Sequence, residues 1–350
     1  MKRFFVILTI LLFIIPSCRR NTGYVMIQGY AQGGTYMVKL NMEGIRMTPE
    51  AIQEGIDSIL TLIDTTLSGY NKGSILSSFN RGEKIRPNAL FIDMYSLAYS
   101  WYEKTEGALD CAAGPVFDLW GFGFTNGEMP TDGAIRSALE SSGMGRLSKD
   151  MEAVIGPDGF LNPMDMMADG GAQSNSAGWP ILNFNAIAQG LSADMVATYL
   201  EELGVKDMLV DIGEIFCCGV NPDGKPWSVG IDRPVDGNNS PGADLEGIWK
   251  SKGIPCGIVT SGNYRKFYVR DGRKYAHTID PRTGYPADNG LLSATVIAPD
   301  AASADALATL CMVLGPDSAK DLVLSLPEIE ACLISSAPSD SMLVWSSPGF

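Results

Sequence analysis

The spacing of apolar residues predicts several long amphipathic helices. Between residues 49 and 67, apolar side chains recur at intervals of three and four, with Thr48 as N-cap and Pro49 at the first helical position. The same spacing predicts helices over residues 88–104, 186–203 and 301–313. Asp300 is placed to cap the last of these helices, and Gly315 follows its end.

Short segments rich in β-branched and aromatic residues predict strands between the helices. Residues 23–40 read as strand, turn and strand, and single strands are predicted over 208–210, 227–231, 258–260 and 292–298. Residues 266–270 and 273–279 flank an Asp-Gly pair, which is typical of a hairpin turn. No regular βαβ alternation, repeat or long linker is present. The pattern therefore predicts an α+β fold, a single large domain with a mainly antiparallel sheet and packed helices.

The first residues read as a targeting segment. Lys2 and Arg3 precede an apolar stretch over residues 4–15, and Ser17 stands directly before Cys18. This order resembles a bacterial lipoprotein signal over residues 1–17, with Cys18 as the lipid anchor; an ordinary signal peptide is the alternative. We then expect a tether over residues 18–26, a domain over residues 27–345, and attachment to the periplasmic side of a bacterial membrane.

Composition excludes some classes of function. The chain has 40 acidic and 26 basic residues, and removal of Lys2 and Arg3 takes its net charge from −14 to −16. Nucleic acid is therefore not an expected partner, because phosphate binding needs a basic surface. His277 is the only histidine, which excludes a His-rich zinc site. The cysteines other than Cys18 form no CxxC pair and are expected to be small buried apolar residues.

Two segments carry candidate catalytic or metal-binding groups. Asp305 and Thr309 lie four residues apart on a predicted helix, where a carboxylate and a hydroxyl on one face suit Mg²⁺. A polar face on a buried helix is the alternative. His277 and Asp280 precede Arg282 at a predicted strand end, where an acid/base beside an anion-binding arginine suits phosphoryl chemistry. A structural turn with a satisfied histidine is the alternative.

Two further segments have the features of ligand contacts. Residues 120–123, Trp-Gly-Phe-Gly, combine rings that can stack with glycines that allow close backbone approach, although an aromatic corner of the core has the same composition. Residues 185–190 open a predicted helix, whose free N–H groups can bind an anion. A simple N-cap by Asn185 is the alternative there.

Taken together, these segments resemble the FAD:protein FMN transferase (ApbE) family. The resemblance spans residues 29–326 and is carried by SGNYRKF at 261–267, HTIDPRTGYP at 277–286 and ADALAT at 304–309. Supporting matches are QGGTY at 32–36, LSGYNKGSILSSFN at 67–80, WGFG at 120–123 and NAIAQG at 185–190. Each motif is short, but their shared order along the chain makes the resemblance specific.

The resemblance implies one α+β domain that binds FAD and Mg²⁺. Such enzymes transfer the FMN moiety to a Thr or Ser hydroxyl of an acceptor flavoprotein subunit and release AMP. Their acceptors are typically membrane or periplasmic electron-transfer proteins. Two other functions would use the same residues: an FAD pyrophosphatase that gives FMN and AMP, and a non-catalytic FAD-binding lipoprotein.

Residue roles follow from the resemblance position by position. Asp305 and Thr309 match metal ligands, and Ala186 matches a residue that offers its backbone carbonyl to the same ion. His277 and Asp280 are candidates for activating the acceptor hydroxyl. The positions that match FAD contacts are Gln32, Trp120, Gly121, Phe122, Gly123, Asn183, Gln189 and Ile279. The positions that differ from the residues usual in the family include Gln32, Asn183, Gln189 and Asn263, and residues 211–214 contain one glycine where relatives usually show two.

Overall fold

One antiparallel sheet runs through the protein. The computed structural model describes residues 23–122, 129–168, 178–238, 240, 242–264, 267–270, 273–338 and 341–350. Within them, eight strands form the main sheet, and every neighbouring pair is antiparallel. Their order across the sheet is β1 (Tyr24–Ala31), β2 (Gly34–Asn41), β3 (Met208–Asp211), β4 (Ile215–Cys218), β7 (Cys256–Gly262), β12 (Leu291–Ala298), β13 (Glu330–Ser336) and β14 (Met342–Ser346). The predicted α+β fold with a mainly antiparallel sheet is confirmed.

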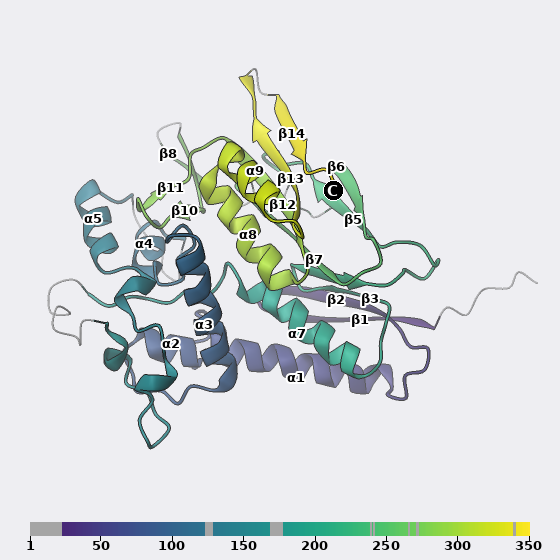
Figure 1. The fold of residues 1–350 in the computed structure, drawn as a ribbon, viewed down its shortest axis with the longest axis horizontal. Helices are drawn as coiled ribbons and strands as arrows, with labels where there is room; N and C mark the ends of the chain where they lie inside the picture. The colour runs from purple at the N-terminus through teal and green to yellow at the C-terminus, as the bar shows by residue number, and fades with distance from the viewer. Residues whose placement is uncertain are drawn as a thin grey trace, which may run out of the picture.

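A layer of helices covers one face of this sheet. Figure 1 shows α1 (Pro49–Leu67), α7 (Ala188–Glu202) and α8 (Ala301–Leu314) crossing in front of the strands, with α9 (Pro316–Ser325) beside α8. In α1 the buried side chains include Ile52, Ile56 and Ile63, which recur with the helical period. Burial of these apolar faces against the sheet forms the main core.

The opposite face of the sheet carries a separate hairpin. It consists of β5 (Ser228–Asp232) and β6 (Leu245–Lys250), which pair only with each other among the described residues. Trp227 and Trp249 from this hairpin are buried in an apolar cluster with Cys217, Cys256 and Ile258 of the main sheet. The main sheet is therefore covered on both faces at its centre.

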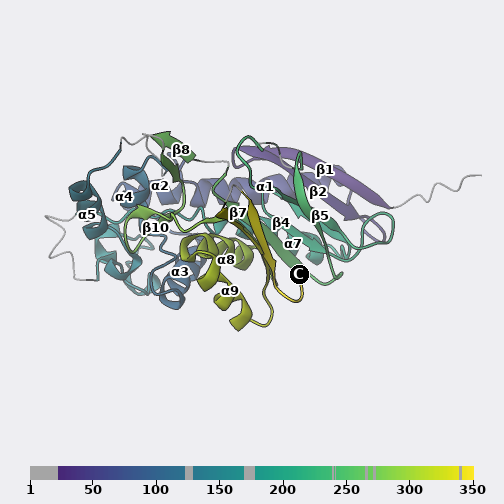
Figure 2. The ribbon, with the colours of Figure 1, turned by 90° about the horizontal axis from the view of Figure 1, so that it is seen from above.

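Several further helices gather at one end of the molecule (Figures 1 and 2). They are α2 (Ile75–Asn80), α3 (Ala89–Lys104), α4 (Gly114–Leu119) and α5 (Asp132–Glu140), with 3-10 turns η1 (Met144–Arg146), η2 (Glu152–Val154) and η3 (Pro163–Met166). Two small ribbons lie nearby: β8 (Phe267–Arg270) with β9 (Arg273–Ala276), and β10 (Ile279–Asp280) with β11 (Tyr285–Pro286). Val116, Trp120, Ile135 and Ile279 form a buried cluster that joins α4, α5 and β10.

Most predicted helices occur at the expected places. The helix at residues 49–67 has its predicted bounds, and Thr48 Oγ1 accepts a hydrogen bond from the amide of Ala51 at 3.3 Å. Asp300 caps α8 by accepting from the amide of Ser303 at 2.6 Å. The helix predicted from residue 186 begins instead at Ala188, because the amide of Gly190, which would bond to the Ala186 carbonyl in a helix from that residue, donates to Asp305 Oδ2 at 3.1 Å.

The strand predicted over residues 273–279 is wrong in its second half. β9 ends at Ala276, and Ile279 belongs to β10, which pairs with β11. Between them, the Thr278 hydroxyl donates to Asn263 Oδ1 at 2.9 Å, and the Thr278 carbonyl accepts from the amide of Ala287. These bonds turn the chain away from the β8–β9 hairpin after Ala276. His277 therefore lies in the connection between β9 and β10 and shares no strand face with Ile279.

The described part begins inside the segment expected to be a tether. β1 starts at Tyr24 and pairs with β2 from its first residue, so residues 24–26 belong to the sheet. Residues 1–17 and Cys18 lie outside the described residues. No helix in the described ranges has both the length and the apolar character that a membrane crossing requires.

Candidate functional site

Helices α7 and α8 meet at a glycine. A Cβ atom on Gly190 would lie 2.2 Å from the carbonyl oxygen of Ala301, so only glycine permits this close approach. Asp194, one turn further along α7, accepts hydrogen bonds from the amides of Ala301 and Ala302 at 2.7 and 2.8 Å. A carboxylate is stabilising at a helix N-terminus, and this contact fixes the start of α8 against α7.

Asp305 is buried at this helix contact. Asp305 is only 5% exposed, and its Oδ2 accepts a hydrogen bond from the amide of Gly190 at 3.1 Å. Burial raises the pKa of Asp305 to about 7, and the nearby charge of Asp194 acts in the same direction. The bond to Gly190 places the Asp305 carboxylate at the first turn of α7, which directly follows Ala186 and Ile187.

Thr309 lies one turn after Asp305 on α8, at the end of strand β7. Its Oγ1 is 3.4 Å from the hydroxyl oxygen of Ser261. Asp305, Thr309 and the turn containing Ala186 therefore offer only oxygen donors and a single carboxylate. No cluster of three or more His, Cys, Asp or Glu side chains that could hold a metal occurs in the described ranges. This donor set fits Mg²⁺, which commonly takes one or two carboxylates and completes its shell with substrate phosphates and water.

Two glutamines lie against α7 near this contact. Gln32, in the turn between β1 and β2, has a positive φ of 52° and donates its side-chain amide to Ser192 Oγ at 2.5 Å. Gln189 Nε2 lies 3.5 Å from the carbonyl oxygen of Ile212 in the turn between β3 and β4. The structure thus brings two of the predicted FAD contacts to the first turns of α7, next to the residues predicted to bind metal.

Asn183 and Asn263 stand where the family resemblance implies that acidic residues are usual. Asn183 is buried, and its backbone amide donates to the carbonyl of Cys111 at 2.7 Å. Its side-chain Oδ1 accepts from the backbone amide of Asn185. Asn263 is also buried, and its Oδ1 accepts from the Thr278 hydroxyl. Both hydrogen bonds need only an acceptor oxygen, which an asparagine supplies without a buried charge.

The predicted aromatic contacts form the other part of the site. Trp120 follows α4; its indole donates to the carbonyl of Gly284 at 2.7 Å and its ring stacks on Tyr275 with centroids 5.7 Å apart. Gly121 has a φ of 75°, a conformation that favours glycine and ends the α4 turn. The Phe122 ring meets His277 edge-on at 6.3 Å. Gly123 lies outside the described residues.

A cavity of about 320 Å³ opens beside this aromatic group. Neither Asp305 nor Thr309 lines it, so the oxygen donors and the cavity are separate parts of the site. Its wall carries flat rings together with polar groups, which suits a planar ligand held by stacking. The lining includes Trp120, Tyr275, Tyr285, Asn263, Tyr264 and Leu291.

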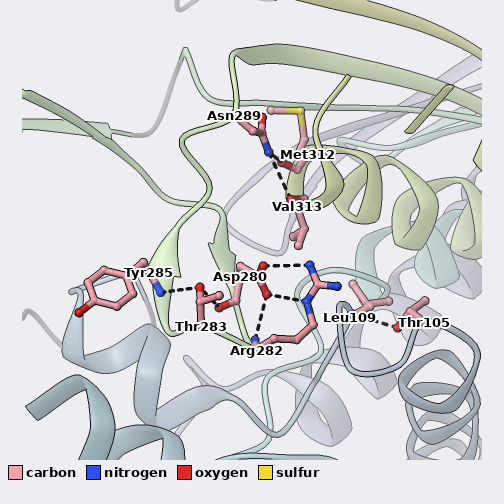
Figure 3. Close-up of polar contacts among 9 residues, drawn as sticks. All are labelled: Thr105, Leu109, Asp280, Arg282, Thr283, Tyr285, Asn289, Met312 and Val313. Atoms are coloured by element: carbon pink, nitrogen blue, oxygen red, sulfur yellow. Dashed lines mark hydrogen bonds and ion pairs between the residues drawn. The ribbon is translucent and has the colours of Figure 1, made fainter. Parts of the chain in front are cut away.

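Asp280 is already engaged by its own turn. Figure 3 shows its carboxylate facing the Arg282 guanidinium, with Oδ1 to Nε at 3.0 Å and Oδ2 to Nη2 at 2.9 Å. Oδ1 also accepts from the Arg282 amide at 2.9 Å, and the Asp280 carbonyl accepts from the amide of Gly284. Asp280 therefore fits the alternative interpretation of this motif, a structural turn. His277 takes no part in that ion pair and is half-buried beside Phe122.

Comparison with known proteins shows the family of this chain. The family model described as "ApbE family" matches residues 33–333. The chain belongs to the ApbE family. It is 32% identical to an FAD:protein FMN transferase of Haemophilus influenzae, covering 88% of this chain and 86% of that protein. It is 31% identical to the protein of the same name from Escherichia coli K12, covering 96% of this chain and 90% of that protein.

Solved structures of the ApbE family have the same fold. The flavin transferase ApbE from Vibrio cholerae superposes with a TM-score of 0.73 at 29% identity, covering 93% of this chain and 98% of that chain. The apo flavinyl transferase ApbE of Pseudomonas stutzeri superposes with a TM-score of 0.76 at 29% identity, covering 93% and 95% of the two chains. The likeness extends over nearly all of this ApbE-family chain.

Sequence reasoning missed some residues that position the site in this ApbE-family chain. Asp194 and Ser192 were not singled out, although Asp194 follows Gly190 by one helical turn and so faces the same partner helix. Ser261 lies within the SGNYRKF motif, but only the structure places its hydroxyl beside Thr309. The helical spacing would have identified Asp194; nothing in the local sequence indicates the Ser261 contact.

Proposed function

We propose that this chain transfers the FMN moiety of FAD to a Thr or Ser hydroxyl of another protein and releases AMP, in a reaction that depends on Mg²⁺. The observation that carries the proposal is the buried contact between Asp305 and the first turn of α7, one helical turn from Thr309. Membership of the ApbE family, and relatives named FAD:protein FMN transferase, support the reaction type.

The oxygen donors would hold the metal ion. Asp305, Thr309 and the carbonyl of Ala186 are the residues that would bind Mg²⁺, which supplies positive charge to the FAD diphosphate when bound. The chain itself fixes these donors through Gly190 and Asp194, which set the position of α8 against α7. A rigid donor set of this kind lowers the cost of arranging the diphosphate for reaction.

The other predicted contacts would hold the two halves of FAD. Gln32, Asn183 and Gln189 lie on or near the start of α7, where amide groups can donate to or accept from the ligand. Residues 120–122 and Ile279 lie at the aromatic group beside the cavity. Stacking against Trp120 and Phe122 would orient a flavin or adenine ring.

His277 is the residue proposed to activate the acceptor. The hydroxyl oxygen forms a bond to the phosphorus of the FMN half, the bond from that phosphorus to the AMP oxygen breaks, and the hydroxyl proton passes to His277. A hydroxyl is a weak nucleophile and needs such a base. Asp280 is the second candidate, but both of its oxygens accept hydrogen bonds from Arg282, so its role is to hold the turn that follows His277.

A labelling assay tests the reaction. The purified full chain is incubated with FAD, Mg²⁺ and an electron-transfer subunit that carries a target threonine, alongside the same acceptor with that threonine replaced by valine. Flavin fluorescence on the denatured threonine acceptor, with one AMP released per label, supports transfer. Free FMN and AMP without labelling would indicate a pyrophosphatase. Tight FAD binding without any product would indicate a flavin-binding lipoprotein.

The location of the protein is part of the proposal. A lipid on Cys18 would tether the domain to the outer side of the cytoplasmic membrane or another periplasmic face, where acceptor subunits of electron-transfer complexes are found. Replacement Cys18→Ala should move the protein from the membrane fraction to the soluble or unprocessed pool. An unchanged membrane fraction would remove Cys18 as the anchor.

A further inference from the structure

Two cysteines face each other across the centre of the main sheet. Strands β4 and β7 are adjacent (Figure 2), and their register pairs Cys217 directly with Cys256. The two Sγ atoms are 3.7 Å apart and share a hydrogen bond. Directly opposed residues of antiparallel strands have Cα atoms about 4.5–5.5 Å apart, and a disulfide spans about 4.4–6.8 Å. The backbone spacing therefore already suits a covalent bond between these residues.

Cys217 and Cys256 lie on the same face of the sheet, whereas Cys218 lies on the opposite face. Cys217 and Cys256 are buried in the apolar cluster beneath the β5–β6 hairpin, with Trp227 and Trp249. Cys218 points to the other face and packs against the helix-covered core. Cys256 is the first residue of β7 and follows an exposed loop residue, Ile254, which is 63% exposed. Cys256 is 6% exposed and Cys217 is 0% exposed, so Cys256 is the nearer of the two to solvent.

We propose that Cys217 and Cys256 form a reversible intrachain disulfide when the protein meets a disulfide oxidant, either a low-molecular-weight disulfide or a dithiol-disulfide oxidoreductase. The Cys256 thiolate attacks one sulfur of the oxidant's disulfide, which forms a mixed disulfide and releases one thiolate. Cys217 then loses its proton and attacks the Cys256 sulfur, which releases the second thiolate. In total, two thiols of the protein are oxidised and one disulfide of the oxidant is reduced to two thiols.

The chemistry of the pair favours this order of attack. The hydrogen bond between the two thiols lowers the pKa of the Cys256 thiol, because the Cys217 S–H stabilises a thiolate at Cys256. The thiolate is the nucleophile in disulfide exchange. Cys217 is fully buried, so in this proposal it reacts only with Cys256 and serves as the resolving cysteine.

The bond would strengthen the support beneath α8. The residue after Cys256 is Gly257, whose Cβ position lies 2.3 Å from the Cα of Ala301, so β7 touches the start of the helix that carries Asp305. A link from β4 to β7 fixes the strand against which α8 is seated. It closes a loop of about 40 residues, for which chain entropy predicts a melting temperature higher by roughly 5 °C.

Peptide mapping tests the proposal. The full chain, first reduced and then exposed to oxidised glutathione, is alkylated under denaturing conditions and digested without reductant. We expect a cross-linked peptide joining the segments that hold Cys217 and Cys256, its loss on treatment with dithiothreitol, and a melting temperature roughly 5 °C above that of the reduced protein. Full alkylation of both residues after oxidation would overturn the proposal.

Matched variants identify the partners. Cys218→Ala changes the adjacent cysteine on the opposite face and should retain both the cross-link and the melting-temperature increase. Cys217→Ala and Cys256→Ala should each lose both. A cross-link that survives in Cys217→Ala, or that disappears in a folded Cys218→Ala, would show that the pairing is wrong. Because these measurements need neither FAD nor an acceptor, their result is independent of whether the transfer reaction is observed.

Discussion

Replacement of Gly190 by alanine gives the most direct test of how the two helices build the site. In an ordinary helix this change stabilises the protein by about 1 kcal/mol, because alanine has the higher helix propensity. Here the added Cβ would lie 2.2 Å from the Ala301 carbonyl oxygen and 2.8 Å from the Cα of Ala302. Both neighbours are backbone atoms, so no side-chain rotation relieves the contact. The structure therefore predicts the opposite sign from propensity.

The size of the effect follows from the same contacts. Ordinary contact begins near 3.4 Å, so α8 must retreat from α7 by about 1 Å. Overpacking of this kind costs roughly 1–3 kcal/mol. Separation also weakens the bond from the Gly190 amide to Asp305, and a hydrogen bond to a charged group contributes roughly 1.5–3 kcal/mol. After the gain of about 1 kcal/mol from propensity, the expected net loss is about 3 kcal/mol.

Urea unfolding and transfer kinetics measure the two consequences. Gly190→Ala should lower the free energy of unfolding by about 3 kcal/mol and reduce kcat/KM for FMN transfer by about 100-fold, since a displacement near 1 Å moves Asp305 away from the turn containing Ala186. Gly247→Ala, on β6, is the matched control, because no heavy atom lies within 4 Å of its Cβ position. A Gly190→Ala protein that is more stable and equally active would refute the reasoning.

Three further predictions concern single side chains. Asp305→Asn removes the only carboxylate of the proposed metal site, so the rise in melting temperature on adding Mg²⁺ with FAD should disappear; an unchanged rise would place the ion elsewhere. Trp120→Phe leaves the buried Gly284 carbonyl without its donor, and should cost about 1–2 kcal/mol of stability and weaken FAD binding in a fluorescence titration. Asp110 lies between α3 and α4 and accepts hydrogen bonds from the amides of Ala112 and Met144. Burial raises the pKa of Asp110 to about 6, so the folded state holds this proton more tightly than the unfolded chain, and the stability it contributes is lost as the pH rises from about 4 to 6. Asp110→Asn should remove about 3 kcal/mol of that pH dependence in urea unfolding, and an unchanged slope would contradict the assignment.

The elements that could be predicted from the sequence are those with strong local signals. Residues 49–67 have regular apolar spacing, a capping threonine and a proline at the first position, and their bounds are as predicted. The prediction of one strand over residues 273–279 was wrong because the sequence pattern typical of a strand continues past Ala276, where β9 ends. What stops β9 is a tertiary contact, the bond from Thr278 to Asn263. A contact between distant segments leaves no trace in the local pattern.

The candidate site divides in the same way. Asp305 and Thr309 could be proposed from their spacing on one helix, and the family resemblance added Ala186. The contact between Asp305 and the Gly190 amide joins residues 115 positions apart, so only the fold reveals it. Asp280 shows the reverse case. Its type and position suit a general base, yet both of its oxygens accept hydrogen bonds from Arg282. The sequence places Asp280 and Arg282 close together but does not say whether the two side chains pair.

Charge is one reason why a neutral residue suits position 183. Burial raises the pKa of Asp194 to about 6 and that of Asp305 to about 7, which shows that a negative charge is already costly at the helix contact. An aspartate at position 183, in the buried loop that leads into α7, would add a third carboxylate to the region proposed to receive an anionic diphosphate. Asn183 keeps the acceptor oxygen that holds the Asn185 amide and avoids that charge. On the proposed function, one ionised carboxylate facing a diphosphate leaves an excess of negative charge that a divalent cation must balance, so FAD affinity should depend more steeply on Mg²⁺ than on any single protein contact.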